Sequence, residues 1–118
     1  MKVAVATDDK KTIRRGHFGD AEMYVIFTVE NGEIVNREER ENPYTDEKLG
    51  ITEHNLPHKA RLILEFLKDC DVFIGRAMGH KNRKILEEEG IKVYLTQSGK
   101  NAEEAVREYL KGVQSQDL

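Results

Sequence analysis

The sequence has a single cysteine, Cys70, and no tryptophan. One thiol cannot form a disulfide within the chain, and one chain cannot build a multi-thiolate metal site from it. This sparing use of cysteine is typical of proteins in a reducing compartment. We therefore expect a cytoplasmic location.

Long hydrophobic runs are also missing. No apolar stretch approaches the roughly 18–20 residues that a helix needs to cross a bilayer. The first residues form a strand-like segment at 2–7 and show no signal-peptide pattern. We therefore expect a soluble protein that does not bind a membrane.

The sequence has no excess of charge of one sign. Charged residues make up 35% of the chain, yet the formal net charge is only −3. A protein that binds nucleic acid over its whole surface is usually strongly basic. We therefore expect no nucleic-acid partner, and any basic site must be local. The 118 residues fit one domain over residues 1–118, because domains commonly run to roughly 100–150 residues.

The rest of the chain is organised around residues 71–80. Residues 71–74 form a short apolar run with β-branched members that ends at Gly75, which is typical of a strand buried on both faces of a sheet. A charged helix is expected over residues 81–89, ending at Gly90, and another strand over residues 91–95. Together they predict one right-handed βαβ unit.

The other segments predict two further strand pairings and two packed helices. Residues 2–7 and 23–29 are strand-like, and Asn31-Gly32 is the residue pair that a type I′ hairpin turn needs. Residues 33–40 should then return as an antiparallel edge strand. Residues 41–55 show no periodicity and predict a long mobile loop. Apolar residues recur at helical spacing over 60–67 and 102–113, each predicting a helix with one packed face.

These elements predict an α/β protein with three layers, α/β/α, and a mixed five-stranded sheet in which only the second strand is antiparallel. Ligands of open α/β sheets bind at the carboxyl edge of the strands, where successive connections leave in opposite directions. Here that point falls between the first strand and the central strand. The loops that flank it are residues 10–19 and 76–80, the two most basic stretches of the chain. Cys70 precedes the central strand and belongs to the opposite edge.

A glycine loop that opens a helix suits an anionic ligand, because exposed backbone N–H groups, the helix dipole and basic side chains all act with the same sign. The candidate cofactor-binding residues at this edge are His17, Arg15, Arg76, Gly79 and His80. The alternative is a tight turn beside a solvated cationic face, with no ligand.

Three histidines, His17, His54 and His80, come to the same edge and are candidate metal ligands. For His17 the alternative is a structural corner in which Phe18 packs and the imidazole hydrogen-bonds the backbone. His54 and His80, taken singly, also fit ordinary surface histidines.

A nuclease with two metal ions is not expected. Asp8, Asp9 and Asp71 could suggest the carboxylates of such a site. Asp71, however, starts its strand at the wrong end of the sheet. We predict no catalytic residues.

The order of motifs resembles that of a known family. It consists of a strand, a loop ending in His17-Phe18-Gly19, a strand, the Asn-Gly hairpin, a helix, a buried strand with a glycine loop, and Ser98-Gly99 before a helix with Tyr109-Leu110 and Gly112. This pattern resembles the dinitrogenase iron-molybdenum cofactor biosynthesis family, found in NifX-like proteins and at the C-terminus of NifB. The resemblance spans nearly the whole chain, and His-Phe-Gly is its most specific element. It implies a ribonuclease-H-like fold with strand order 3-2-1-4-5.

The resemblance also implies a function. Family members in nitrogen fixation bind or carry iron-sulfur or iron-molybdenum cofactor precursors. The chain has no Cys-x-x-x-Cys-x-x-Cys motif, so the radical-SAM chemistry of NifB is not expected. We therefore expect a non-catalytic binder or carrier of an anionic iron-sulfur or iron-molybdenum cofactor or precursor, with a protein partner in cluster assembly as one possibility. The alternative is an interaction or regulatory module for a phosphorylated metabolite or protein partner, since the glycine loop suits phosphate equally.

Overall fold

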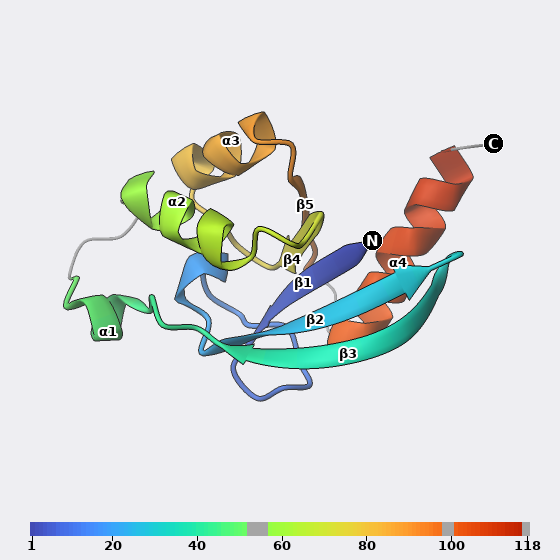
Figure 1. Ribbon diagram of the computed structural model, residues 1–118, viewed down its shortest axis with the longest axis horizontal. Coiled ribbons are helices and arrows are strands. Elements are labelled where there is room, and N and C mark those ends of the chain that lie inside the picture. Colours follow the sequence, from blue (N-terminus) through green and yellow to red (C-terminus); the bar gives the residue numbers. More distant parts are fainter. Residues whose placement is uncertain (52–56, 98–100, 117–118) are drawn as a thin grey trace.

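Five strands form one mixed sheet in the computed structural model, which describes residues 1–51, 57–97 and 101–116 (Figure 1). The strands are β1 (Lys2–Thr7), β2 (Met23–Glu30), β3 (Glu33–Glu41), β4 (Val72–Gly75) and β5 (Lys92–Leu95). The helices are α1 (Asp46–Leu49), α2 (Pro57–Phe66), α3 (His80–Glu88) and α4 (Ala102–Gln116), and a short 3-10 helix, η1, covers Phe18–Asp20.

The strand order across the sheet is β3-β2-β1-β4-β5. β4 pairs in parallel with both β1 and β5, whereas β2 is antiparallel to both β1 and β3. All four residues of β4 are buried, as expected for a strand covered on both faces. The predicted sheet with an antiparallel second strand is confirmed, and so is the order that the resemblance implied.

Helices cover both faces of this sheet, with α2 and α3 on one side and α4 on the other (Figure 1). Successive residues of a strand point to opposite faces. Val3 and Val5 accordingly belong to the core that packs against α4, while Ala4 and Ala6 belong to the core that packs against α2 and α3. The predicted three-layer arrangement is confirmed.

The β2–β3 hairpin turns at the predicted residues. Asn31 has φ 54° and Gly32 has φ 78°, the two positive φ values of a type I′ turn. This turn lies at the amino edge of β1 and β4. The loops that follow β1 and β4 therefore lie at the opposite, carboxyl edge.

The prediction of one long loop without periodicity over residues 41–55 was wrong in part, because α1 lies inside it. The Thr45 side chain accepts a hydrogen bond from the Lys48 N–H at 3.2 Å, and Gly50, with φ 68°, ends the helix. Four residues are too few to produce a visible helical period. Residues 52–56 lie outside the described part of the chain.

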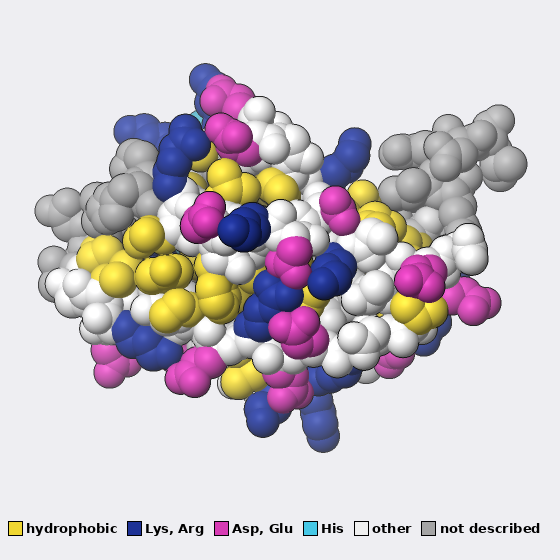
Figure 2. All heavy atoms as spheres, viewed as in Figure 1, with side chains coloured by type: hydrophobic (Ala, Val, Ile, Leu, Met, Phe, Trp, Pro, Cys, Tyr) yellow, Lys and Arg dark blue, Asp and Glu magenta, His cyan; other side chains and the backbone are white. Residues whose placement is uncertain are grey.

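The surface carries mixed charge, as the small net charge predicts. Basic and acidic side chains are interspersed on the face shown in Figure 2. Arg40, for example, lies 2.6 Å from carboxylate oxygens of both Glu38 and Asp69. Within the described residues, no helix is long and apolar enough to cross a membrane.

Candidate functional site

The segment His17-Phe18-Gly19 is anchored in the core by Phe18. The ring of Phe18 is 1% exposed and stacks on Phe73 of β4, with ring centroids 4.9 Å apart. The Tyr24 hydroxyl donates a hydrogen bond to the Phe18 carbonyl oxygen at 2.8 Å. Gly75 leaves room for the ring, because a Cβ there would lie 3.2 Å from Phe18 Cδ2. The segment is therefore a fixed corner of the fold.

Asn42, which directly follows β3, holds the same corner. Its side chain is fully buried, and Nδ2 donates to the carbonyl oxygens of Gly19 at 3.1 Å and Ala21 at 2.8 Å. Buried carbonyl groups need donors. The Asn42 amide therefore fixes the path of the chain between the corner and β2.

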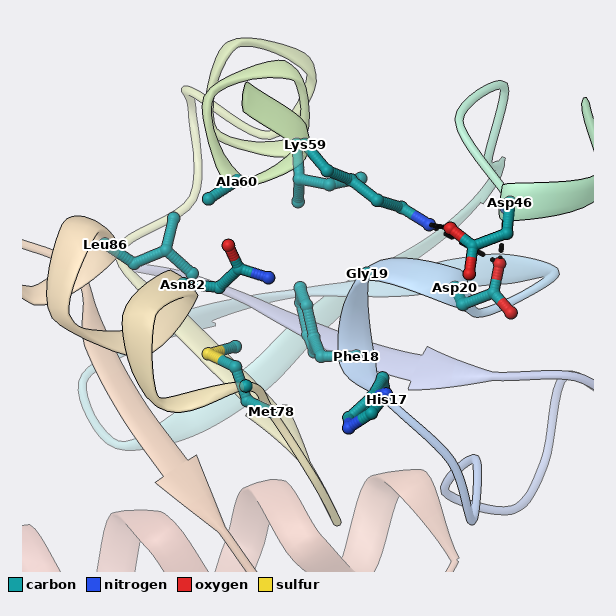
Figure 3. A pocket seen from close by; sticks show the side chains of 12 residues that line it. His17, Phe18, Gly19, Asp20, Asp46, Lys59, Ala60, Met78, Asn82 and Leu86 are labelled. Atoms are coloured by element: carbon teal, nitrogen blue, oxygen red, sulfur yellow. Dashed lines mark hydrogen bonds and ion pairs between the residues drawn. The ribbon is translucent and has the colours of Figure 1, made fainter. Parts of the chain in front are cut away.

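His17 joins the loop after β1 to the loop after β4. It forms an isolated parallel bridge with Ala77, and the Phe18 N–H donates to the Ala77 carbonyl oxygen at 2.8 Å. The His17 side chain is exposed and lies at the rim of a cavity (Figure 3). The two loops predicted to flank the switch point are thus in direct contact.

The first hollow at this edge lies between these two loops, and we call it the basic groove. Its volume is about 570 Å³. Eight residues from the loop after β1 and the start of the loop after β4 line it: Asp8, Asp9, Thr12, Ile13, Arg14, Arg15, Gly16 and Arg76. It lies at the switch point between β1 and β4, where the sequence placed a ligand site.

The two carboxylates of the basic groove are already engaged. Arg14 Nη1 lies 2.9 Å from Asp8 Oδ1. Asp9 accepts hydrogen bonds from the Thr12 N–H at 2.7 Å and the Thr12 hydroxyl at 2.7 Å. The Thr12 N–H, followed by the Thr12 hydroxyl and the Lys11 N–H, holds the pKa of Asp9 well below its ordinary value. Asp8 is thus paired with a cation, whereas Asp9 keeps its negative charge and is held by neutral donors. The lining of the groove has three arginines against two carboxylates.

Arg15 and Arg76 supply the remaining positive charge. Arg15 is exposed and has no ion pair with any described residue. Arg76 donates from Nε to the Ile13 carbonyl oxygen and from Nη1 to the Gln97 carbonyl oxygen, both at 3.3 Å. These two bonds position the guanidinium and leave its other N–H donors available. The basic groove can therefore attract an anion.

The second hollow lies between the His17-Phe18-Gly19 corner, α2 and α3, and we call it the inner cavity (Figure 3). Its volume is about 40 Å³. The lining combines apolar and polar side chains with two glycines: His17, Phe18, Gly19, Asp20, Asp46, Lys59, Ala60, Ile63, Met78, Gly79, Asn82 and Leu86. The Lys59 side chain is only 9% exposed, and its Nζ lies 2.5 Å from Asp46 Oδ1 and 3.5 Å from Asp20 Oδ1.

The sequence model of one family, described as dinitrogenase iron-molybdenum cofactor, matches residues 1–112. The chain belongs to this family. The resemblance carried by the His-Phe-Gly corner and the glycine loop is thereby confirmed. None of the curated proteins compared matches the chain.

Several solved structures share the fold of this family member. The apo form of the orange protein from Desulfovibrio gigas is 19% identical, with a TM-score of 0.72 and coverage of 94% of this chain and 88% of that one. PH0822 is 21% identical, with a TM-score of 0.70 and coverage of 95% and 90%. The MJ0327 protein of Methanocaldococcus jannaschii is 18% identical, with a TM-score of 0.66 and coverage of 95% and 89%. At these identities the likeness shows the fold.

The predicted site residues of this family member are divided between hollows. Arg15 and Arg76 meet in the basic groove, whereas His17 and Gly79 line the inner cavity. His80 begins α3 and lines a separate surface hollow along that helix.

The metal set His17, His54 and His80 stays a prediction, because His54 lies outside the described residues. Among the residues that are described, no three His, Cys, Asp or Glu side chains are grouped closely enough to hold a metal ion.

Cys70 is not part of this edge. It lies before β4, is 3% exposed, and its Sγ contacts Asp69 Oδ1 at 3.7 Å. Burial, followed by the negative charge of Asp69, raises the pKa of the Cys70 thiol to about 12. A thiol with such a pKa is a poor metal ligand at neutral pH.

Sequence reasoning missed the polar residues that shape the inner cavity. Asp20 and Asp46 both contact Lys59 of α2, which lies 39 residues from Asp20 and 13 residues from Asp46 along the chain. Asn82 occupies the first turn of α3, which was predicted only as a charged helix. One signal was available, since Asp20 directly follows the His-Phe-Gly corner.

Proposed function

We propose that the protein binds or carries an anionic metal-sulfur cofactor, or a precursor of one, at the carboxyl edge of its sheet, without catalysing its assembly. The iron-sulfur or iron-molybdenum species is cargo in this proposal. Family membership supports the class of ligand. The observation that carries the proposal is the charge of the basic groove.

The basic groove favours an anion because its lining has three arginines and two carboxylates, and Arg15 and Arg76 are not paired with any described carboxylate. Arg76 is also held in place by two backbone carbonyl oxygens. A preorganised guanidinium loses little freedom when it binds a ligand. An anionic cluster larger than a single ion would fit the volume of about 570 Å³.

His17 is the residue we propose as a ligand to exposed iron of the cargo. Its backbone is fixed by the bridge to Ala77, and its side chain is exposed at the same edge. Imidazole suits iron as a ligand, so a cluster that arrives assembled needs no thiolate from the carrier. Gly79 and His80, at the start of α3, would add backbone N–H groups and a basic side chain.

Anaerobic titration with a preassembled iron-sulfur cofactor, followed by gel filtration, tests the proposal. We expect the visible absorption of the cofactor to elute with the protein. A NifX-like protein run in parallel shows that the conditions allow binding. The proposal would be contradicted if the cofactor eluted together with the NifX-like protein but separately from this protein.

The uncapped start of α3 favours a second candidate, a regulatory module that binds a phosphorylated metabolite. Gly79 is the N-cap and offers no side-chain hydrogen bond, and no acidic residue occupies the first turn. Helix N-termini of this kind bind phosphate. A thermal-shift screen of nucleotides and sugar phosphates separates the two candidates, because a tight phosphate ligand that is unaffected by His17→Ala would favour the second.

A further inference from the structure

Asn82 is the one feature of the inner cavity that packing does not explain. Its Oδ1 atom is buried and has no hydrogen-bond partner among the described residues. Its side chain projects from α3 into the space between Phe18 and Ala60 (Figure 3). Buried carbonyl oxygens without a donor are rare in native proteins, because each one lowers stability. A ligand with an N–H or O–H group would supply the missing donor.

Each carboxylate at the inner cavity already contacts a cation, and Lys59 and Arg14 are each shared between two carboxylates. Lys59 pairs with Asp46. Asp20 lies 3.4 Å from Arg14 Nη2 and accepts the Asp46 N–H at 2.6 Å. An anionic ligand would therefore meet two carboxylates, and a cationic ligand would have to compete with Lys59 and Arg14 for carboxylates that they already contact. The ligand should be uncharged.

The start of α3 lies beside the same space. Gly79 and Asn82 both line the inner cavity, and no side chain caps the helix. The first N–H groups of a helix have no acceptor within it. A ligand with a hydrogen-bond acceptor beside its donor would accept from an N–H group of this helix end and donate to Asn82 Oδ1.

The volume and the apolar lining of the inner cavity limit the size and polarity of the ligand. A volume of about 40 Å³ corresponds to roughly three water molecules. The wall is formed by Phe18, Ile63, Met78 and Leu86. The ligand should therefore have few non-hydrogen atoms and a short apolar body.

We propose that the inner cavity is a second binding site, for a small uncharged molecule with an apolar body and a polar end that both donates and accepts hydrogen bonds. A short primary carboxamide is the simplest example. The inner cavity has no lining residue in common with the basic groove, although His17 and Gly79, which we propose to contact the anionic cargo, lie in its lining. Arg76→Ala should therefore leave carboxamide binding unchanged.

Three probes of similar size and different charge test this inference: propionamide, propionate and propylammonium. The protein contains three methionines, and only Met78 lines the inner cavity. With methionine methyl groups labelled for NMR, each probe is added up to about 100 mM, which covers the millimolar Kd expected for so small a ligand. Met1, at the opposite end of β1, is the internal reference.

We expect propionamide to shift the Met78 methyl signal saturably while Met1 does not move. The two charged probes should bind at least about tenfold more weakly, because propionate would meet carboxylates and propylammonium would have to compete with Lys59 and Arg14 for them. Equal binding of propionate or propylammonium would overturn the inference. So would the absence of any saturable shift with propionamide. This comparison uses the wild-type protein and does not depend on a variant that folds.

Asn82→Leu is the matching variant, and Lys84→Leu, at an exposed position of the same helix, is its control. We expect Asn82→Leu to abolish the propionamide response and to raise the midpoint of urea unfolding, because the unpaired oxygen is removed. Lys84→Leu should keep the response. A folded Asn82→Leu protein that binds propionamide as the wild type does would contradict the inference.

Discussion

Phe18 packs against Gly75 so closely that a Cβ on Gly75 would lie 3.2 Å from Phe18 Cδ2. This contact links the corner that carries His17 to the end of the central strand β4. The position of His17 therefore depends on the absence of a side chain at Gly75 in the central strand. The edge that we propose as the binding site is built on the same packing that stabilises the fold.

Gly75→Ala is expected to destabilise the protein by about 1–3 kcal/mol, because the Phe18 ring has to move. Urea unfolding measures the change. Gly112→Ala is the matched control, since nothing lies within 4 Å of the Cβ it would add. In helix α4 this control should instead gain about 0.5–1 kcal/mol. Equal effects of the two substitutions would show that Phe18 does not depend on Gly75.

Asn42→Ala should cost about 2–4 kcal/mol, because it leaves the Gly19 and Ala21 carbonyl oxygens without their donor and opens space in the core. Asn36→Ala, at an exposed position of β3, should change the free energy of unfolding by less than about 0.5 kcal/mol. Chemical denaturation of both variants tests the role of Asn42 in holding the corner. Similar stability of the two variants would remove that role.

The hydrogen bonds of Asp9 predict a dependence of stability on pH. Its pKa is lowered in the folded protein, so the stability it contributes is fully present above its unfolded pKa of about 4. This contribution is lost as the pH falls toward the folded pKa. Between about pH 5 and pH 3, we therefore expect the free energy of unfolding of Asp9→Asn to fall less steeply than that of the wild type. Parallel curves from urea titrations at each pH would contradict this.

Cys70→Ser should leave cofactor binding intact, while the buried hydroxyl costs about 1–3 kcal/mol of stability. His17→Ala should weaken binding because it removes a ligand to the cargo. Co-elution of the cofactor with each folded variant on gel filtration tests both expectations. If Cys70→Ser abolished binding and His17→Ala had no effect, a thiolate bridging two copies of the chain would replace the site proposed here.

The sequence predicted those features that depend on local pattern. The apolar run that ends at Gly75 placed the central strand, and Asn31-Gly32 placed the hairpin. Connection lengths then placed the loops of His17 and Arg76 at one edge, where the structure joins them through Ala77. Each of these inferences needs only a few consecutive residues or the known geometry of parallel sheets.

The inner cavity could not be predicted in this way. Lysine is usually found at the surface. Lys59 is buried only because Asp20 and Asp46 reach it from distant segments. The division of the predicted site residues among three hollows likewise depends on contacts between distant segments. Such contacts between residues far apart in sequence leave no periodic pattern. For the same reason Arg15 and His17, two residues apart, were predicted in one site and line different hollows.

The central claim is that the basic groove holds anionic cargo, and the affinity of Arg76→Ala for a preassembled iron-sulfur cofactor tests it most directly. The matched control is Arg107→Ala, an exposed arginine of α4 that lies outside the groove. We expect Arg76→Ala to bind about two- to fivefold more weakly than the control at low salt. The difference should shrink as salt screens the charge. Equal affinities of the two variants at low salt would contradict the account.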